Sequence, residues 1–151
     1  MIRCVEITLS IPDNEAETAA ATLARLGFPG AALVRGDLYR LEVDAAGAGP
    51  ELLDALRRIE PLFNPNKHVL RERGTQPEAG EVWIHEIAHG AAPADGPVRI
   101  AGRTLPGVRR IERFTVWRLG DASGAPAADD VVVRATETLL CNPAFQVATT
   151  R

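Results

Sequence analysis

Three landmarks that recur at one constant spacing constrain this 151-residue chain more than any other feature of its sequence. Asn64-Pro65 recurs as Asn142-Pro143 (142 − 64 = 78), Tyr39-Arg40-Leu41 recurs as Trp117-Arg118-Leu119, and Val69 recurs as Val147. Chance rarely produces one offset over so much chain, so we infer a duplicated unit. The first repeat is predicted over residues 1–73 and the second, divergent repeat over residues 81–151, with residues 74–80 as the linker.

The first repeat has the pattern of a β-α-β-α-β unit. Alternation of apolar and polar residues predicts strands over residues 2–9, 32–43 and 68–73. Apolar residues at helical spacing predict a helix that begins near Asn14 and stops at Gly27. A second helix is predicted from Pro50 to the prolines that begin at Pro61, because proline interrupts a helix.

The second repeat is predicted to follow the same order less regularly. Strands are expected over residues 81–87, 108–119 and 145–150, and a helix from Asp129 to Cys141. Its first helix is expected within residues 97–105 and should be short or irregular, because Gly102 and Pro106 interrupt it. One unit alone buries little apolar surface. The sequence therefore predicts an α+β fold, in which two tandem units form a pseudo-twofold dimer with the helices packed on one side of the sheet.

Charge and hydropathy argue against several classes of partner. Lysine and arginine number 17 against 20 acidic residues, so no overall positive field would attract nucleic acid or a membrane surface. No stretch approaches the roughly 20 apolar residues of a membrane span, and Arg3 and Glu6 interrupt the apolar start that a signal peptide would need. Cys4 and Cys141 lie far apart and are expected to be buried thiols. We expect a cytoplasmic protein.

A zinc-site motif, His85-Glu86-Ile87-Ala88-His89, is the sharpest chemical signal in the chain. On a helix, His85 and His89 would lie one turn apart and bind zinc, while Glu86 would act as general base of a small zinc-dependent hydrolase. The duplication predicts a strand here instead, with the two imidazoles roughly 13 Å apart. The secondary structure of this segment therefore decides between the two interpretations. The sequence contains no phosphate-binding or dinucleotide-binding loop, and no cofactor is expected.

Tyr39 and Trp117 occupy matching positions of the two repeats. Either they pack beneath the helices, or they lie on a surface where an aromatic side chain anchors a partner. The sequence alone leaves both alternatives open.

In its order of motifs the chain resembles the PurS family, the small subunit of phosphoribosylformylglycinamidine synthase, an enzyme of purine biosynthesis. The matching segments are Arg25-Leu26-Gly27-Phe28, Val34-Arg35-Gly36, and the Leu-x-Asn-Pro helix exits at Leu62 to Pro65 and Leu140 to Pro143. The resemblance covers nearly all of residues 2–73. It covers the second repeat more thinly, mainly at Arg113 to Leu119 and at the second helix exit.

The resemblance implies a scaffold subunit without an active site of its own. In the family, the small subunit bridges an ATP-dependent synthetase subunit and a glutaminase subunit and helps ammonia pass between them. A single copy usually dimerises there, whereas a tandem chain would carry both copies and could pair again. Gly36-Asp37 stands where the family usually has Gly-Lys, so the role of that lysine has no counterpart here. A stand-alone PurS-like binding module is the third alternative.

Overall fold

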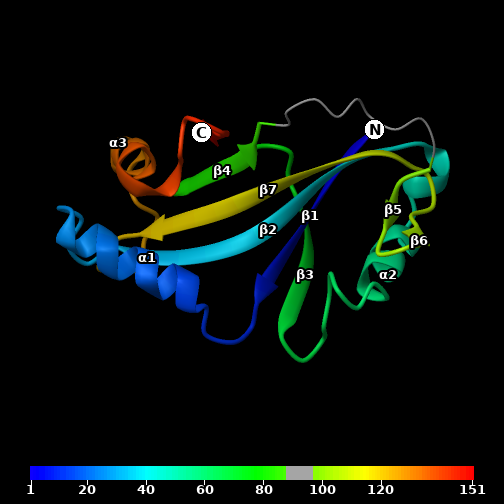
Figure 1. Cartoon of the computed structure of the whole chain (residues 1–151), viewed down its shortest axis with the longest axis horizontal. Helices are drawn as coiled ribbons and strands as arrows, with labels where there is room; N and C mark the ends of the chain where they lie inside the picture. Colours follow the sequence, from blue (N-terminus) through cyan, green and yellow to red (C-terminus); the bar gives the residue numbers. More distant parts are fainter. Residues whose placement is uncertain (88–96) are drawn as a thin grey trace. The chain divides into compact units, whose positions relative to one another are not determined.

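The computed structural model describes residues 1–87 and 97–151, which form a six-stranded antiparallel sheet with three α-helices (Figure 1). The strand order is β3-β1-β2-β7-β4-β8. The strands of this sheet are β1 (Ile2–Leu9), β2 (Ala32–Val43), β3 (His68–Arg73), β4 (Glu81–Glu86), β7 (Val108–Gly120) and β8 (Gln146–Thr150). The α+β class predicted from the sequence is confirmed.

The three α-helices are shorter than the helices predicted from the sequence. They are α1 (Asn14–Arg25), α2 (Glu51–Arg57) and α3 (Asp129–Ala135). A 3-10 turn, η1 (Ala45–Gly47), follows β2, and a π-helical turn, η2 (Thr136–Leu140), continues α3. None of the helices in the described part of the chain is long and apolar enough to cross a membrane. The cytoplasmic location stays a prediction.

The elements gather into two compact units. Among the described residues, unit 1 contains residues 1–11, 38–75 and 97–113, and unit 2 contains residues 12–37, 76–87 and 114–151. Both β2 and β7 are divided between the units, since the boundaries fall at residues 37–38 and 113–114. Each unit is thus assembled from segments of both predicted repeats.

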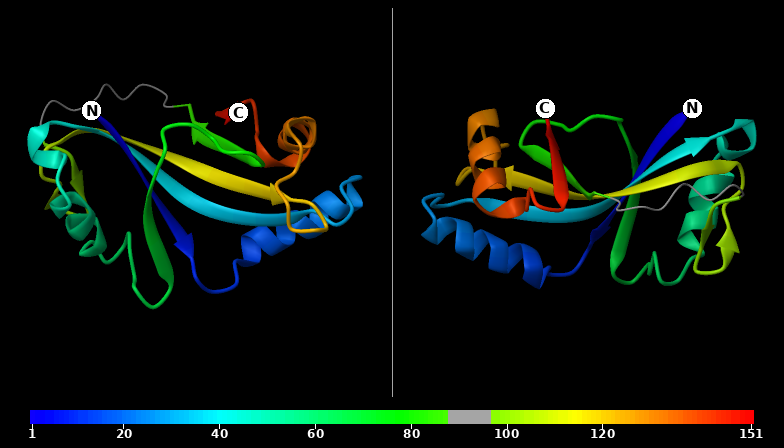
Figure 2. Two further views of the ribbon diagram at one scale, coloured as in Figure 1. Left: turned by 180° about the vertical axis from the view of Figure 1, so that it is seen from behind. Right: turned by 45° about the horizontal axis from the view of Figure 1, so that its top comes forward.

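In unit 1, α2 covers strands β1 and β2. Leu52 and Leu56 lie four residues apart, on one face of the helix, and join a buried cluster with Val5 and Ile7 of β1 and Leu41 of β2. Alternate residues of a strand point to the same face, which is why Val5 and Ile7 enter the cluster together. Figure 1 also shows the hairpin of β5 (Arg99–Ile100) and β6 (Arg103–Thr104) beside α2, and Figure 2 shows the same neighbours from behind.

In unit 2, α1 and α3 pack together over β4 (Figure 2). The Asp13 carboxylate caps α1 by accepting hydrogen bonds from the N–H groups at positions 15 and 16. Leu23 of α1 and Val132 of α3 are buried in one cluster with Val82 and Ile84 of β4. The amphipathic helix predicted after Asn14 is therefore present, with its buried stripe facing this cluster.

The turns that lead into β3 and β8 have the same hydrogen-bond pattern. The N–H of Asn64 donates to Nδ1 of His68 at 2.9 Å, and the N–H of Asn142 donates to Oε1 of Gln146 at 2.8 Å. Both asparagine side chains accept a bond from the N–H two residues later. Proline follows each asparagine, so the two turns share their sequence and their geometry.

The strands that follow these turns pair in matching registers. Leu9 lies opposite His68 in the β1–β3 pair, and Glu86 lies opposite Gln146 in the β4–β8 pair. Beyond each strand pair, one further backbone bond forms, from Ser10 N–H to the Lys67 carbonyl and from the N–H at position 87 to the carbonyl at 145, both at 2.8 Å. The second pair thus repeats the first.

The prediction of a short or irregular helix within residues 97–105 is wrong. Strands β5 (Arg99–Ile100) and β6 (Arg103–Thr104) form a hairpin there. Its two-residue loop consists of Ala101 and Gly102, whose φ angles of 48° and 78° are both positive. Two positive φ angles in a two-residue loop are typical of the type I′ turn, which matches the twist of paired strands. Gly102 therefore marks a hairpin turn instead of a weak point in a helix.

Two glycines allow the turn after β2 to contact the segment before β7 within unit 1. A Cβ atom on Gly107, where φ is +66°, would lie 2.0 Å from the backbone nitrogen of Gly47. Asp44 reinforces this contact, because its N–H donates to the Gly107 carbonyl at 2.9 Å and its carboxylate pairs with Arg109 at 2.6 Å. The hydrogen bond from Arg109 is the main reason that the pKa of the Asp44 carboxyl lies below its usual value.

We expect Gly107→Ala to destabilise the fold far more than Gly102→Ala. Both glycines have positive φ, which costs an alanine about 1–2 kcal/mol, but nothing lies within 4 Å of a Cβ on Gly102. At Gly107 the overlap with backbone atoms adds about 1–3 kcal/mol. Urea unfolding of both variants measures the difference. Equal losses of unfolding free energy would contradict the close contact.

We expect Asp44→Asn to change how stability depends on pH. A carboxyl with a lowered pKa in the folded state stabilises the protein above its unfolded-state value of about 3.9, and this contribution is lost as the pH falls. The variant should therefore be less stable than the parent at about pH 7, and the difference should shrink as the pH falls below about 4. Urea unfolding over this pH range tests it, with Arg109→Gln expected to show the same trend. A difference that does not vary with pH contradicts the assignment.

Candidate interaction surface

The first two residues of the zinc-site motif lie on a strand. His85 and Glu86 are the last residues of β4, paired with Val147 and Gln146 of β8. The zinc-hydrolase hypothesis requires a helical turn that starts at His85, and the backbone there is extended. The His85 ring instead contacts Phe114, with the ring centroids 5.1 Å apart. His89 lies outside the described residues, so no candidate site is built on this motif.

Tyr39 and Trp117 are both buried. Tyr39 is 9% exposed in the cluster of unit 1, and Trp117 is 7% exposed in the cluster of unit 2. Each ring lies on the strand face that the helices of its own unit cover. Neither ring is therefore an exposed aromatic anchor.

A network of arginine and glutamate side chains occupies the other strand face of unit 1. We call it the charged face; its members are Glu6, Arg40, Glu42, Arg71, Arg73, Arg110 and Glu112. On β2, β3 and β7 these residues are two apart, so they point to one side of the strand, and Glu6 of β1 points opposite to its neighbour Val5. The charged face thus carries four guanidinium groups and three carboxylates across β3, β1, β2 and β7.

One part of the charged face is buried. The Glu6 side chain is 0% exposed and lies 3.0 Å from a nitrogen of Arg71 and 3.3 Å from a nitrogen of Arg73, which is 3% exposed. Cys4 is also fully buried, and this burial raises the pKa of its thiol, an effect that Arg40 and Arg73 oppose without reversing it. A buried thiol with a raised pKa is a poor nucleophile, so Cys4 contributes to the core of the unit and not to covalent chemistry.

The other part of the charged face is open to solvent. Arg40 and Arg110 both pair with Glu112, at 3.2 Å and 2.8 Å, and their side chains are 43% and 58% exposed. With Ile2 and Glu42 these residues line a shallow hollow over β1, β2 and β7. The hollow presents two guanidinium groups and two carboxylates beside Ile2, which suits contact with a surface that carries charges of both signs.

The charged face was not predicted from the sequence. A signal for it exists, because Arg40-x-Glu42, Arg71-x-Arg73 and Arg110-x-Glu112 each place charges two residues apart within a predicted strand. Glu6 gives no such signal, since a single glutamate in a strand normally faces water.

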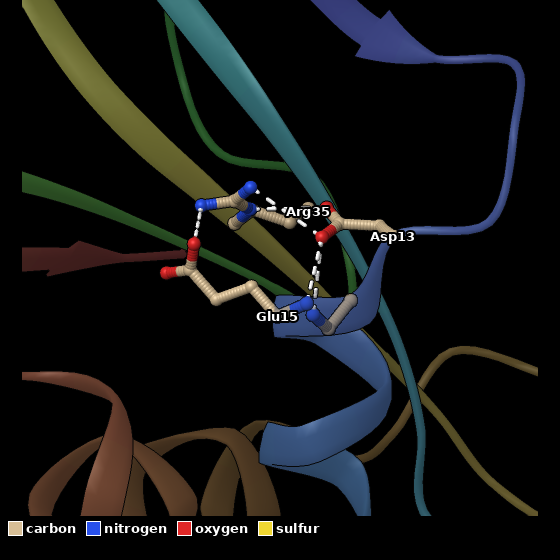
Figure 3. Close-up of polar contacts among 4 residues, drawn as sticks. Asp13, Glu15 and Arg35 are labelled. Carbon is tan, nitrogen blue, oxygen red and sulfur yellow. Dashed lines mark hydrogen bonds and ion pairs between the residues drawn. The ribbon is translucent and has the colours of Figure 1, made fainter.

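A second ionic cluster lies at the start of α1 in unit 2. Arg35 of β2 donates to the Asp13 carboxylate at 3.0 Å and also pairs with Glu15 (Figure 3). Asp13 is the cap of α1, so Arg35 ties the start of the helix to the strand beside it. The cluster is satisfied within the protein and fixes local structure. In the PurS resemblance Arg35 belongs to the Val34-Arg35-Gly36 segment, and this contact gives that arginine a structural role.

The described residues contain no group of three or more histidine, cysteine, aspartate or glutamate side chains that could hold a metal ion. Comparison with known protein families, with curated proteins and with solved structures found no match.

We expect Glu6→Gln to destabilise the protein strongly. Loss of the carboxylate leaves the buried Arg73 guanidinium without this counter-charge, and breaking a buried ion pair costs about 3–5 kcal/mol. Glu112→Gln is the control on the same face, where Glu112 is 33% exposed and the loss should not exceed about 1 kcal/mol. Urea unfolding measures both. If the two variants lose the same free energy, Glu6 has no special role in the fold.

Proposed function

We propose that the chain is a scaffold subunit of phosphoribosylformylglycinamidine synthase, built from two tandem PurS-like units. In this role it would bridge the synthetase and glutaminase subunits and assist ammonia transfer in purine biosynthesis, without catalysing a reaction itself. The proposal starts from the resemblance of the two Leu-x-Asn-Pro helix exits and the Val34-Arg35-Gly36 segment to the family.

The observation that carries the proposal is the agreement between the two Asn-Pro turns. Asn64 and Asn142 make equivalent backbone and side-chain hydrogen bonds, and each turn leads into a strand with an equivalent antiparallel partner. This agreement supports a duplicated unit at the same 78-residue spacing on which the family resemblance rests. It also favours the tandem arrangement over a chain with two unrelated domains.

The charged face supports a role in binding other proteins. Alternating guanidinium and carboxylate groups orient a partner and set the rate of association, and they supply no nucleophile for a reaction. The side chains of Arg40 and Arg110 are 43% and 58% exposed while both pair with Glu112. We therefore propose the open part of the charged face as a surface that meets one of the two larger subunits.

Reconstitution with the synthetase and glutaminase subunits of the same organism tests the function. We expect the three proteins to co-purify and glutamine-dependent formation of phosphoribosylformylglycinamidine to require this chain. Formation driven by added ammonia should not require it, because the synthetase carries the chemistry. If the chain associates with neither subunit and its omission changes neither rate, the proposal is wrong and the stand-alone module becomes the better hypothesis.

Matched charge reversals test the surface. Arg110→Glu places a third carboxylate beside Glu42 and Glu112, and we expect it to weaken assembly about tenfold and reduce the glutamine-dependent rate at limiting concentration. Arg58→Glu reverses a charge on an exposed residue at the end of α2 and should leave both unchanged. Binding assays at two salt concentrations measure the effect. Equal effects of the two variants would exclude the charged face as the contact.

A further inference from the structure

Strand β8 lies at one end of the sheet order, and within the described residues its only strand partner is β4. The carbonyl at position 145 accepts a hydrogen bond from the N–H at position 87. This bond fixes which residues of β8 direct their backbone groups toward β4. In an antiparallel pair, every second residue directs its N–H and C=O toward the neighbouring strand. The backbone groups of Val147 and Thr149 therefore face β4, and those of Ala148 and Thr150 face outward. The Gln146 carbonyl also faces outward, while the Gln146 N–H donates to the Asn142 carbonyl at 2.9 Å.

The outer edge of β8 lacks the protection that edge strands usually have. Natural edge strands avoid pairing with other chains by carrying charges, proline or a bulge. The other edge of the sheet, β3, carries Arg71, Glu72 and Arg73, whereas β8 reads Gln-Val-Ala-Thr-Thr and has neither a charge nor a proline. Because the turns before the two strands are equivalent, the comparison is between matching edges, of which only one is charged.

Exposed apolar side chains surround this edge in unit 2. Val147 is 42% exposed and Phe145 is 43% exposed. Val133 lies on α3, which contacts β8, and is 39% exposed, and Leu139 of the following turn η2 is 37% exposed. An uncharged edge with apolar neighbours favours a partner that pairs with the backbone and brings apolar surface of its own.

We propose that β8 pairs antiparallel with β8 of a second copy of this chain, about a twofold axis that passes beside Ala148. Pairing all five residues of the strand sets Ala148 opposite Ala148 and Gln146 opposite Thr150 of the second copy. Because the Gln146 N–H donates to the Asn142 carbonyl within each copy, these three pairs give about four hydrogen bonds between the copies. Val147 then lies opposite Thr149 of the second copy, a pair without charge.

A second copy of this chain is the partner that fits the edge of β8 best. The strand is self-complementary, since no charge meets a like charge when it pairs with itself, and a twofold contact closes after two copies. Pairing of β8 with β3 of another copy would set Arg71 and Glu72 against uncharged residues and would extend into an open chain of copies. This inference is independent of the proposed function, because it rests on unit 2 and its edge alone.

Complementary charges at the axis test the proposal with the full chain. Ala148 is exposed, so Ala148→Glu and Ala148→Lys should leave the fold intact. We expect the parent chain to be a dimer by sedimentation, and each variant alone to dissociate at least about tenfold more readily, because two like charges meet at the axis. An equimolar mixture of the two variants should recover the dimer, since glutamate then meets lysine. If the substitutions dissociated the dimer by unfolding the chain, mixing the two variants would not recover it.

Val147→Glu and Val69→Glu form the matched control, since the two valines hold equivalent positions on the two edges and are 42% and 51% exposed. Only Val147→Glu should weaken the dimer. A parent chain that sediments as a monomer overturns the proposal. So does a dimer that the Ala148 variants leave unchanged, a mixture that does not recover, or an assembly that Val69→Glu dissociates.

Discussion

The register of the antiparallel pairs β1–β3 and β4–β8 is the constraint on which the rest of the structure depends. In a strand, a slip of one residue exchanges the two faces, so the register decides which side chains enter the core. The Asn-Pro turns set it, since Asn64 and Asn142 each bind the first side chain of the strand that follows. With this register, Val5 and Ile7 reach the core of unit 1 while Glu6 points to the charged face.

The position of Glu6 shows what a fixed register requires of the opposite face. A buried carboxylate is tolerated only when charges and hydrogen bonds compensate it, and Arg71 and Arg73 supply that compensation from β3. Such a network adds little net stability, because removing ions from water offsets most of their attraction. Its effect is on specificity, because a one-residue slip of β3 would turn Arg71 and Arg73 to the opposite face and leave Glu6 buried without them.

Much of the secondary structure could be predicted from the sequence, and the tertiary arrangement could not. The strands over residues 2–9, 32–43 and 68–73 were predicted with the bounds that the structure has, because alternation is a local signal. The hairpin at Ala101 and Gly102 was missed because an alanine with positive φ has no signature in the sequence.

The charged face was missed for a different reason. Burial of Glu6 depends on residues about 65 positions away in the sequence, Arg71 in particular. No local pattern predicts a contact over that sequence separation. The choice between core and surface for Tyr39 and Trp117 likewise required knowing which helix lies over each strand. Local alternation of apolar and polar residues predicts which residues share a face of a strand. Which helix packs against that face depends on the whole chain.

The division of β2 and β7 between the two units has a consequence for how this chain can change in evolution. Each unit draws on both predicted repeats, so a chain that lost either repeat would leave two incomplete cores. Deletion of either predicted repeat would remove part of both hydrophobic clusters at once. Substitutions on the exposed surfaces leave the two cores intact, whereas loss of either predicted repeat does not.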